Sequence, residues 1–594
     1  MRYIKIFWGL LLWIAAFGCT NSFHMKHLDT TEIDTLFENY YEGYIHFFPF
    51  VATMQGDNRF NDLLPNDISQ KFKNDLISFC KHYLEIVDHV DTSNLPENYK
   101  INLEVLHEDL SLLIEEQQFH DEYTPVDQFN SLTISFPQMG SGFGIHPFKT
   151  VKDYFDFLKR VDGFVTWCDT AIANMQTGIK EGFTNPKVIM ERTLPQLRSL
   201  ITDDVAQNIF YKPVENFPKS FNTAERDSLK ALYTNAIKDK IVPAYKKLYT
   251  FIEKEYIPAC RKTSGIYGTP DWKKRYSVAI RYWTGTDISA DSIYALGLNE
   301  VKRIKDEMET VRTKVKFKGS LDQFLTFTEE DKQFKPFRTA DGILNYYKNV
   351  EERIKPELKV MFHLVPKAKF EIRQTEQFRE ASASAEYIVA SADGSRPGVF
   401  YVPINNSTEY NYIDMEATFL HEAIPGHHYQ LSIQQEMQNL PKFRKFGGSG
   451  AYIEGWALYC ESLGKELGIY TDPYEYFGRL SNEMLRAVRL VVDVGMHTKG
   501  WTREQAIRYM KENTAISDAG AVAEIERYMI WPGQALAYKM GELKIKELRK
   551  KAEGALGAKF KISEFHDQIL DQGALPPGIL EKKIDRWLAG KTNN

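Results

Sequence analysis

Along most of the chain, apolar residues recur every three or four positions, the spacing that places them on one face of an α-helix. The longest stretches with this spacing are residues 153–179, 224–256, 289–315 and 534–552. Strand-like alternation is rare, and no internal repeat interrupts the helical pattern. The pattern therefore predicts a mostly α-helical protein. A chain of 594 residues is too long for one hydrophobic core, so we expect a large two-lobed body around a deep cleft.

One short segment departs from the helical pattern. Residues 397–403 read Pro-Gly-Val-Phe-Tyr-Val-Pro, an apolar run with proline at each end, which is typical of a β-strand. The surrounding residues 391–411 are rich in Ser, Gly, Asn and Pro and predict loops. We therefore expect a small β element here. We also expect a boundary between an N-terminal helical half, residues 20–390, and a second half, residues 391–594.

The first 19 residues have the pattern of an export signal. Arg2 and Lys5 precede an apolar stretch, residues 6–17, that is short for a transmembrane helix. Gly18 and Cys19 then resemble the end of a bacterial lipoprotein signal, in which the cysteine is lipidated. We expect residues 1–19 to be a signal peptide and the protein to be exported and anchored through Cys19, on a periplasmic or outer-membrane face. An ordinary signal peptide cut nearby is the alternative.

Charge and cysteine content exclude several other classes of protein. The net charge is −6 and the sequence pI is about 6.2, so no basic surface is expected for nucleic acid. Membrane contact is expected through the lipid anchor only. The four remaining cysteines form no CxxC pair, which leaves out zinc-finger and dithiol redox motifs.

The segment with the clearest chemistry is residues 418–429, Thr-Phe-Leu-His-Glu-Ala-Ile-Pro-Gly-His-His-Tyr. Three of the 14 histidines lie within eight residues, beside a glutamate. In zinc peptidases, two histidines one helical turn apart bind the metal, and the glutamate after the first histidine activates water. The segment predicts one Zn²⁺ ion with His421 as a ligand and Glu422 as the base. Histidine and glutamate also suit manganese and cobalt.

The second histidine, however, is six or seven residues after His421 rather than four. On a regular helix six positions rotate a side chain about 120° away, and seven positions move it about 10 Å along the axis. Pro425 lacks the N–H for the helix and Gly426 relaxes the backbone, so we expect a bulge. Looping out two residues makes His427 the second ligand, and looping out three makes it His428.

A third ligand is expected from a neighbouring helix. Glu454 lies in the apolar stretch of residues 451–459, which can return antiparallel after the glycine-rich residues 447–450. Gly455 leaves room for another helix to approach closely. Glu461 lies two turns further on the same face, where it can hold the N–H of a ligand imidazole. A plain salt-bridged residue is the alternative for Glu454.

A stripe of polar residues follows in an apolar helix. Arg486, Arg489, Asp493 and His497 lie among Ala, Val and Leu residues. Buried charges of this kind need partners. His497 can donate to a developing oxyanion, or Arg489 can hold a substrate carboxylate. A solvated stripe is the alternative.

These blocks, with residues 486–497 and 526–539, resemble the bacterial family named domain of unknown function 885. The resemblance covers about residues 30–590 as one continuous unit. It implies distant kinship with the helical gluzincin zinc peptidases of the neurolysin and carboxypeptidase Taq type, whose motif also has glycine just before the second histidine. It thus favours His427 as the ligand.

The same resemblance implies further site residues. Substrate would lie along an edge strand before the zinc helix, here Val399, Phe400 and Tyr401. A C-terminal tyrosine would stabilise the tetrahedral intermediate, with Tyr538 the closest equivalent and Tyr528 the next. We expect zinc-dependent hydrolysis of peptide bonds, in short peptides. The alternatives are a zinc amidohydrolase acting on a non-peptide amide and a lipid-anchored binding protein without catalysis.

Overall fold

The structure, a computed structural model, describes residues 26–376, 384–390 and 396–592. Cys19 and the predicted signal peptide lie outside these ranges. None of the helices within them combines the length and the apolar character that crossing a membrane requires.

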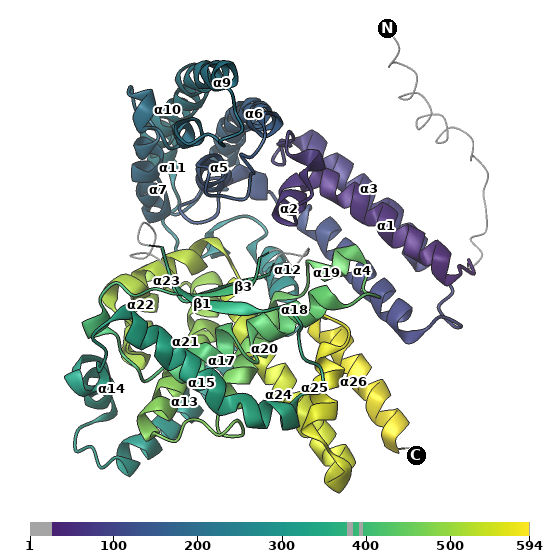
Figure 1. Cartoon of the computed structure of the whole chain (residues 1–594), viewed down its shortest axis with the longest axis vertical. Coiled ribbons are helices and arrows are strands. Elements are labelled where there is room, and N and C mark those ends of the chain that lie inside the picture. The colour runs from purple at the N-terminus through teal and green to yellow at the C-terminus, as the bar shows by residue number, and fades with distance from the viewer. Residues whose placement is uncertain (1–25, 377–383, 391–395, 593–594) are drawn as a thin grey trace.

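Helices make up most of the fold, as the apolar spacing predicts (Figure 1). The helices before the sheet are α1 (Thr30–Phe47), α2 (Pro49–Met54), α3 (Gln70–Asp88), α4 (Glu97–Glu116), α5 (Leu132–Gly140), α6 (Val151–Glu181), α7 (Lys187–Ser199), α8 (Lys212–Glu215), α9 (Thr223–Ala236), α10 (Val242–Phe251), α11 (Ile257–Ala259), α12 (Trp272–Thr284), α13 (Ala290–Lys314), α14 (Leu321–Glu330) and α15 (Ala340–Met361). Those after it are α17 (Met415–Glu422), α18 (His427–Glu436), α19 (Lys442–Lys445), α20 (Gly450–Ser462), α21 (Pro473–Thr498), α22 (Arg503–Asn513), α23 (Asp518–Ile530), α24 (Ala537–Leu556), α25 (Ile562–Leu570) and α26 (Pro577–Thr592).

The β element is a small mixed sheet of three strands. Its strands are β1 (Phe370–Gln374), β2 (Glu386–Ile388) and β3 (Gly398–Val402), in the order β1-β3-β2. β3 is the strand predicted from the proline-bounded run. It pairs in parallel with β1 and antiparallel with β2, so β3 is the central strand.

Several hydrophobic cores stabilise the chain, as its length predicts. The largest contains residues of α15, β3, α17, α20 and the three C-terminal helices. A second lies among α6, α7, α9 and α10, which Figure 1 shows grouped apart from the body that carries the sheet. A third joins α13 to α21, α22 and α23. The deep cleft between two lobes stays a prediction.

The expected boundary near residue 390 falls inside the largest core. Ile343 and Tyr347 of α15 belong to the same cluster as Phe400 of β3 and Phe419 of α17. β1 and β3 also pair across this position. The division into residues 20–390 and 391–594 stays a prediction.

Candidate metal centre

The histidine motif spans the end of one helix and the start of the next. α17 ends at Glu422 and α18 begins at His427. Between them, the backbone of Ala423 (φ −105°, ψ −102°) and Gly426 (φ −74°, ψ −129°) leaves the helical region. The predicted bulge in one continuous helix is therefore wrong. Pro425 has no N–H to donate to the His421 carbonyl, and the helix stops and restarts instead.

Packing explains the residues at this break. A Cβ on Gly426 would collide with the backbone carbonyl oxygens of Leu420 and His421, so only glycine permits α18 to start so close to α17. The Trp456 indole N–H of α20 donates to the Pro425 carbonyl at 2.9 Å. Trp456 thus ties the break to the helix that carries Glu454. Trp456 is not among the residues predicted from the sequence, and its place two residues after the predicted ligand Glu454 was the available signal.

The break brings three predicted ligands together. His421, His427 and Glu454 each offer one donor atom, and these atoms all lie within 4.8 Å of one another. Glu454 Oε2 is 3.7 Å from His421 Nε2 and 3.6 Å from His427 Nε2. Ligands bound about 2 Å from one tetrahedral ion are roughly 3.3 Å apart, so these separations suit a shared ion.

Glu461 orients the first imidazole. Nδ1 of His421 donates to Glu461 Oε1 at 2.8 Å, which turns Nε2 toward Glu454. Burial lowers the pKa of His421, but hydrogen bonds to Glu454 and Glu461 outweigh it and raise the pKa to about 9. Burial raises the pKa of Glu454, but hydrogen bonds from His421 and His427 bring it well below its usual range. Both shifts favour a positive charge next to an ionised Glu454 carboxylate.

Replacing Glu461 by glutamine is expected to weaken zinc binding about tenfold, the lower end for loss of an outer hydrogen-bond partner. The amide keeps an oxygen that can accept from Nδ1 of His421 but removes the negative charge. Competition with a chromophoric zinc chelator measures the affinity. Unchanged affinity would show that Glu461 does not support the ligand.

His428 faces the sheet instead of the three ligands. Its Nδ1 lies 2.8 Å from the Tyr387 hydroxyl of β2, and the ring also hydrogen-bonds the Ala368 backbone. Its ring packs 4.7 Å from that of Phe370 in β1. Because these contacts hold the imidazole on the sheet side, the geometry favours His427 over His428 as the second ligand.

Glu422 lies at the end of α17 beside these ligands. Burial raises the pKa of its carboxyl, and the charge of Glu454 raises it further, while His421, His427 and Arg486 act in the opposite direction. A carboxyl whose pKa moves toward neutrality suits proton transfer at physiological pH.

Tyr538 approaches the same place from α24. Gly455 of α20 meets Gly541 of α24 with no room for a Cβ on either residue, as the prediction for Gly455 requires. Burial raises the pKa of Tyr538, and the charge of Glu454 raises it further. The Arg489 guanidinium lies 4.6 Å from the centre of the Tyr538 ring. The Tyr538 hydroxyl forms no hydrogen bond with any other residue that the structure describes.

The second tyrosine is already engaged. The Tyr528 hydroxyl accepts from Nε of Arg489 at 2.7 Å and donates to the Glu524 carboxylate. Nη2 of Arg489 donates to Glu524 Oε2 at 2.8 Å, while Nη1 is buried without a partner among the described residues. Tyr528 and Glu524 therefore hold Arg489 in place, and only Nη1 of Arg489 is left without a partner among the described residues. Glu524, one turn before Tyr528, is not among the residues predicted from the sequence.

The rest of the polar stripe is structural. His497 Nδ1 accepts from the Ile266 N–H at 3.2 Å, and Nε2 donates to the Tyr528 carbonyl at 3.0 Å. Asp493 accepts from the Tyr276 hydroxyl at 2.6 Å. Burial lowers the pKa of His497 to about 3. With both ring nitrogens bound to backbone, His497 has no N–H for an oxyanion, and its expected catalytic role is wrong. Arg489, Asp493 and His497 are buried and hydrogen-bonded, so this part of the stripe is not solvated. Arg486 is half-buried, and its Nη1 donates to the Asn482 carbonyl at 3.2 Å.

The strand predicted to bind substrate, β3, lies between two other strands. β3 pairs with β1 and β2, so its backbone is not free to bind an extended peptide. Val399 and Phe400 are buried, and Phe400 packs 5.1 Å from Tyr347. Tyr401 is half-buried. The proline-bounded run is a core strand, and the assignment of Val399 and Phe400 to substrate binding is wrong.

Solved structures share this fold. A "putative lipoprotein" from Colwellia psychrerythraea is 27% identical, with a TM-score of 0.85 over 94% of this chain and 99% of that chain. A "putative lipoprotein of unknown function" from Shewanella oneidensis is 18% identical, with a TM-score of 0.71 over 93% of this chain and 99% of that chain. The Pyrococcus furiosus carboxypeptidase reaches a TM-score of only 0.35, which carries no argument.

No curated protein matches the sequence. The profile of one bacterial protein family matches residues 49–584, nearly the whole of the described chain. This match confirms the resemblance drawn from the histidine motif and the C-terminal blocks. The chain belongs to the family of bacterial proteins of unknown function called DUF885.

Proposed function

We propose that this protein is a zinc-dependent hydrolase that cleaves peptide bonds in short peptides. The observation that carries the proposal is the convergence of His421, His427 and Glu454 on one point, with Glu422 beside them. Two imidazoles and one carboxylate form a ligand set that leaves a coordination position open, as in catalytic zinc sites. The hydrogen bond by which Glu461 orients His421 also supports a metal-binding role for this histidine.

A bound zinc ion would supply Lewis-acid polarisation of the scissile carbonyl and lower the pKa of water at the site. Glu422 would take a proton from the attacking water and pass it to the leaving amine nitrogen. The Tyr538 hydroxyl, which has no other described partner, would donate to the oxyanion. Arg489 would hold the Tyr538 ring through its cation–π contact.

Replacing Tyr538 by phenylalanine is expected to lower kcat about 10²-fold with little change in KM, because the hydroxyl acts mainly on the transition state. Steady-state kinetics on a cleaved peptide give both constants. The matched control is Tyr509→Phe, which changes a tyrosine of α22 outside the site. Equal activity of the Tyr538 variant and wild type would remove Tyr538 from the mechanism.

The proposed location is the bacterial envelope, with Cys19 as the lipidated residue. Gly18 and Cys19 carry this proposal, and two solved structures of the same fold are each described as a "putative lipoprotein". The preference for short peptides follows from the gluzincin resemblance and is part of the proposal.

The proposal is tested with the mature protein, zinc-loaded or stripped with a chelator. Each form is assayed on free di- to pentapeptides and on N-acyl amino acids. Peptide cleavage that disappears with chelation and returns with zinc supports the proposal. Cleavage of N-acyl amino acids alone would favour the zinc amidohydrolase. Absence of stoichiometric metal, even after zinc addition, would overturn the proposal in favour of a binding protein.

A further inference from the structure

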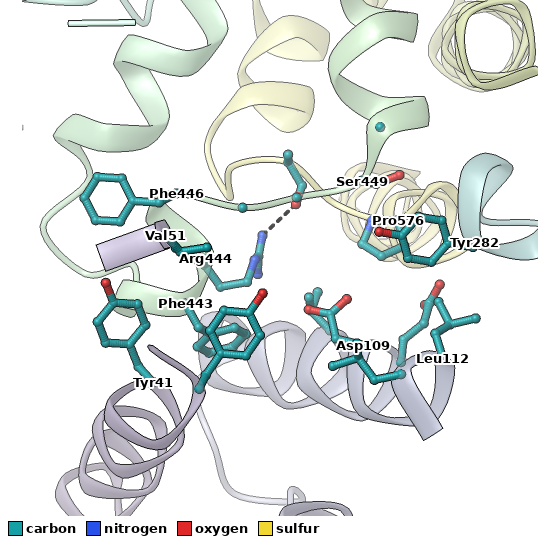
Figure 2. A pocket seen from close by; sticks show the side chains of 18 of the residues that line it. Tyr41, Val51, Asp109, Leu112, Tyr282, Phe443, Arg444, Phe446, Ser449 and Pro576 are labelled. Carbon is teal, nitrogen blue, oxygen red and sulfur yellow. Dashed lines mark hydrogen bonds between the residues drawn. The ribbon is translucent and has the colours of Figure 1, made fainter. Parts of the chain in front are cut away.

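A second site is suggested by a cavity of about 390 Å³ between α1, α4, α12 and residues 442–450 (Figure 2). No predicted metal ligand lines it. Its volume is in the range of small-ligand pockets. Seven of the residues that line it are aromatic: Tyr40, Tyr41, Tyr44, Tyr282, Trp283, Phe443 and Phe446.

Two carboxylates of α4, Glu108 and Asp109, also line this cavity. Neither forms a hydrogen bond or an ion pair with another residue that the structure describes. Burial raises the pKa of Asp109 to about 7; the charge of Arg444 lowers it, and that of Glu108 raises it. A carboxylate in such a setting is costly unless a cation compensates it.

The two cations of the cavity wall have other partners. Arg444 Nη1 donates to Asn102 Oδ1 at 2.8 Å, and Nη2 donates to the Gln572 and Ala574 carbonyls at 2.7 and 3.1 Å. Figure 2 shows Arg444 with one hydrogen bond to a neighbouring residue of the cavity wall. Lys442 pairs with Glu38 at 2.5 Å. Arg444 acts on Asp109 through its charge, and Lys582 and Arg281 act on Glu108 in the same way. None of these cations forms an ion pair with either carboxylate among the described residues, so both carboxylates lack a direct cationic partner.

The aromatic wall is suited to the same kind of ligand. Asp109 lines the same cavity as Tyr40, Tyr44 and Tyr282. Burial raises the pKa of each of these tyrosines, and the charge of Asp109 contributes to the rise. Aromatic faces attract cations within about 6 Å. At the edge of the cavity, the Lys442 ammonium already lies 5.7 Å from the centre of the Tyr41 ring.

We propose that this cavity binds a compact organic ammonium group, with Asp109 and Glu108 as its counter-ions and the tyrosine rings as its wall. A bare metal ion fits less well, because the cluster of metal-binding donors among the described residues is the separate set at His421. An anion fits less well, because Nη1 and Nη2 of Arg444 already donate hydrogen bonds to oxygens of the protein.

Helix α20 links the wall of this cavity to the candidate metal centre. Gly450 lines the cavity and begins α20, and Glu454 lies four residues later on the same helix face, about 6 Å along the axis. The ammonium group can therefore come from the amino terminus of a peptide whose backbone extends toward the metal centre, or from a free amine. Only the peptide source rests on the proposed function.

Calorimetric titration of the metal-stripped mature protein tests the proposal and separates it from catalysis. The probes are trialanine, N-acetyl-trialanine, which lacks the ammonium group, and butylammonium chloride. Butylammonium is expected to bind. Trialanine is expected to bind at least about tenfold more tightly than its acetylated form, because a charge-assisted hydrogen bond is lost on acetylation. If trialanine and butylammonium compete for the cavity, the ammonium group can come from a peptide. If only butylammonium binds, the ligand is a free amine.

Asp109→Asn is expected to weaken butylammonium binding about tenfold, because asparagine keeps the shape of the aspartate side chain but loses its negative charge. Asp75→Asn, an exposed carboxylate of α3, is the matched control and should bind as wild type does. Tyr282→Ala, at a side chain 42% exposed, tests the aromatic wall if the Asp109 variant does not fold. Absence of amine binding, or equal binding by wild type and both cavity variants, would overturn the proposal even if zinc-dependent hydrolysis were established.

Discussion

Glu422→Gln is expected to lower kcat by about 10³-fold while the protein keeps one equivalent of zinc. Glutamine has nearly the shape of glutamate but cannot accept the proton of water. The Glu422 carboxyl lies beside His421, His427 and Glu454 but is not in the set of converging donors. Loss of turnover with retained metal is therefore the signature of a base rather than a ligand.

Metal content by mass spectrometry and kcat on the same preparation measure both parts of this prediction. Glu409→Gln, an exposed carboxylate six residues before α17, is the matched control and should keep wild-type activity. A Glu422 variant that loses its metal would make Glu422 a ligand. One that keeps full activity would remove the proposed mechanism.

His427→Ala is expected to lose its bound zinc, whereas His428→Ala keeps one equivalent. Removing a ligand should weaken binding by more than about 100-fold, the upper end for losing only an outer partner. His428 bonds Tyr387 and the Ala368 backbone, so its loss should cost stability, about 1–3 kcal/mol, rather than metal. Glu454→Ala should behave as His427→Ala does.

Thermal unfolding with and without zinc gives an independent measurement. A thousandfold excess of zinc over Kd stabilises a binding-competent protein by about 4 kcal/mol, which wild type and His428→Ala should show. His427→Ala and Glu454→Ala should show no zinc-dependent shift. The opposite pattern for the two histidines would mean that α18 turns a different face to the site.

One helix, α20, organises the whole region. It carries the predicted ligand Glu454, the residue Glu461 that hydrogen-bonds His421, and the indole of Trp456 that hydrogen-bonds the break before His427. Gly455 allows α24 to pack closely and bring Tyr538 near Glu454. Variants that shift α20 should therefore affect metal binding and turnover together.

The sequence by itself determined the helical architecture, because apolar spacing is a local property of the chain. It also narrowed the candidate metal-binding residues to within one histidine. His421 and His427 are separated by only six residues, and the proline and glycine between them are short-range signals for a break. Glu454 and Glu461 followed from helix periodicity on a nearby stretch.

Only the tertiary structure decided what these side chains contact across long separations. His497 and Ile266 are 231 positions apart, so no local pattern could show that a backbone N–H occupies Nδ1. The central place of β3 depends on pairing with two strands that carry little signal of their own. The cavity around Asp109 joins α1, α4, α12 and the loop before α20. Local periodicity specifies elements, whereas hydrogen-bond partners, strand order and cavities depend on how distant elements pack.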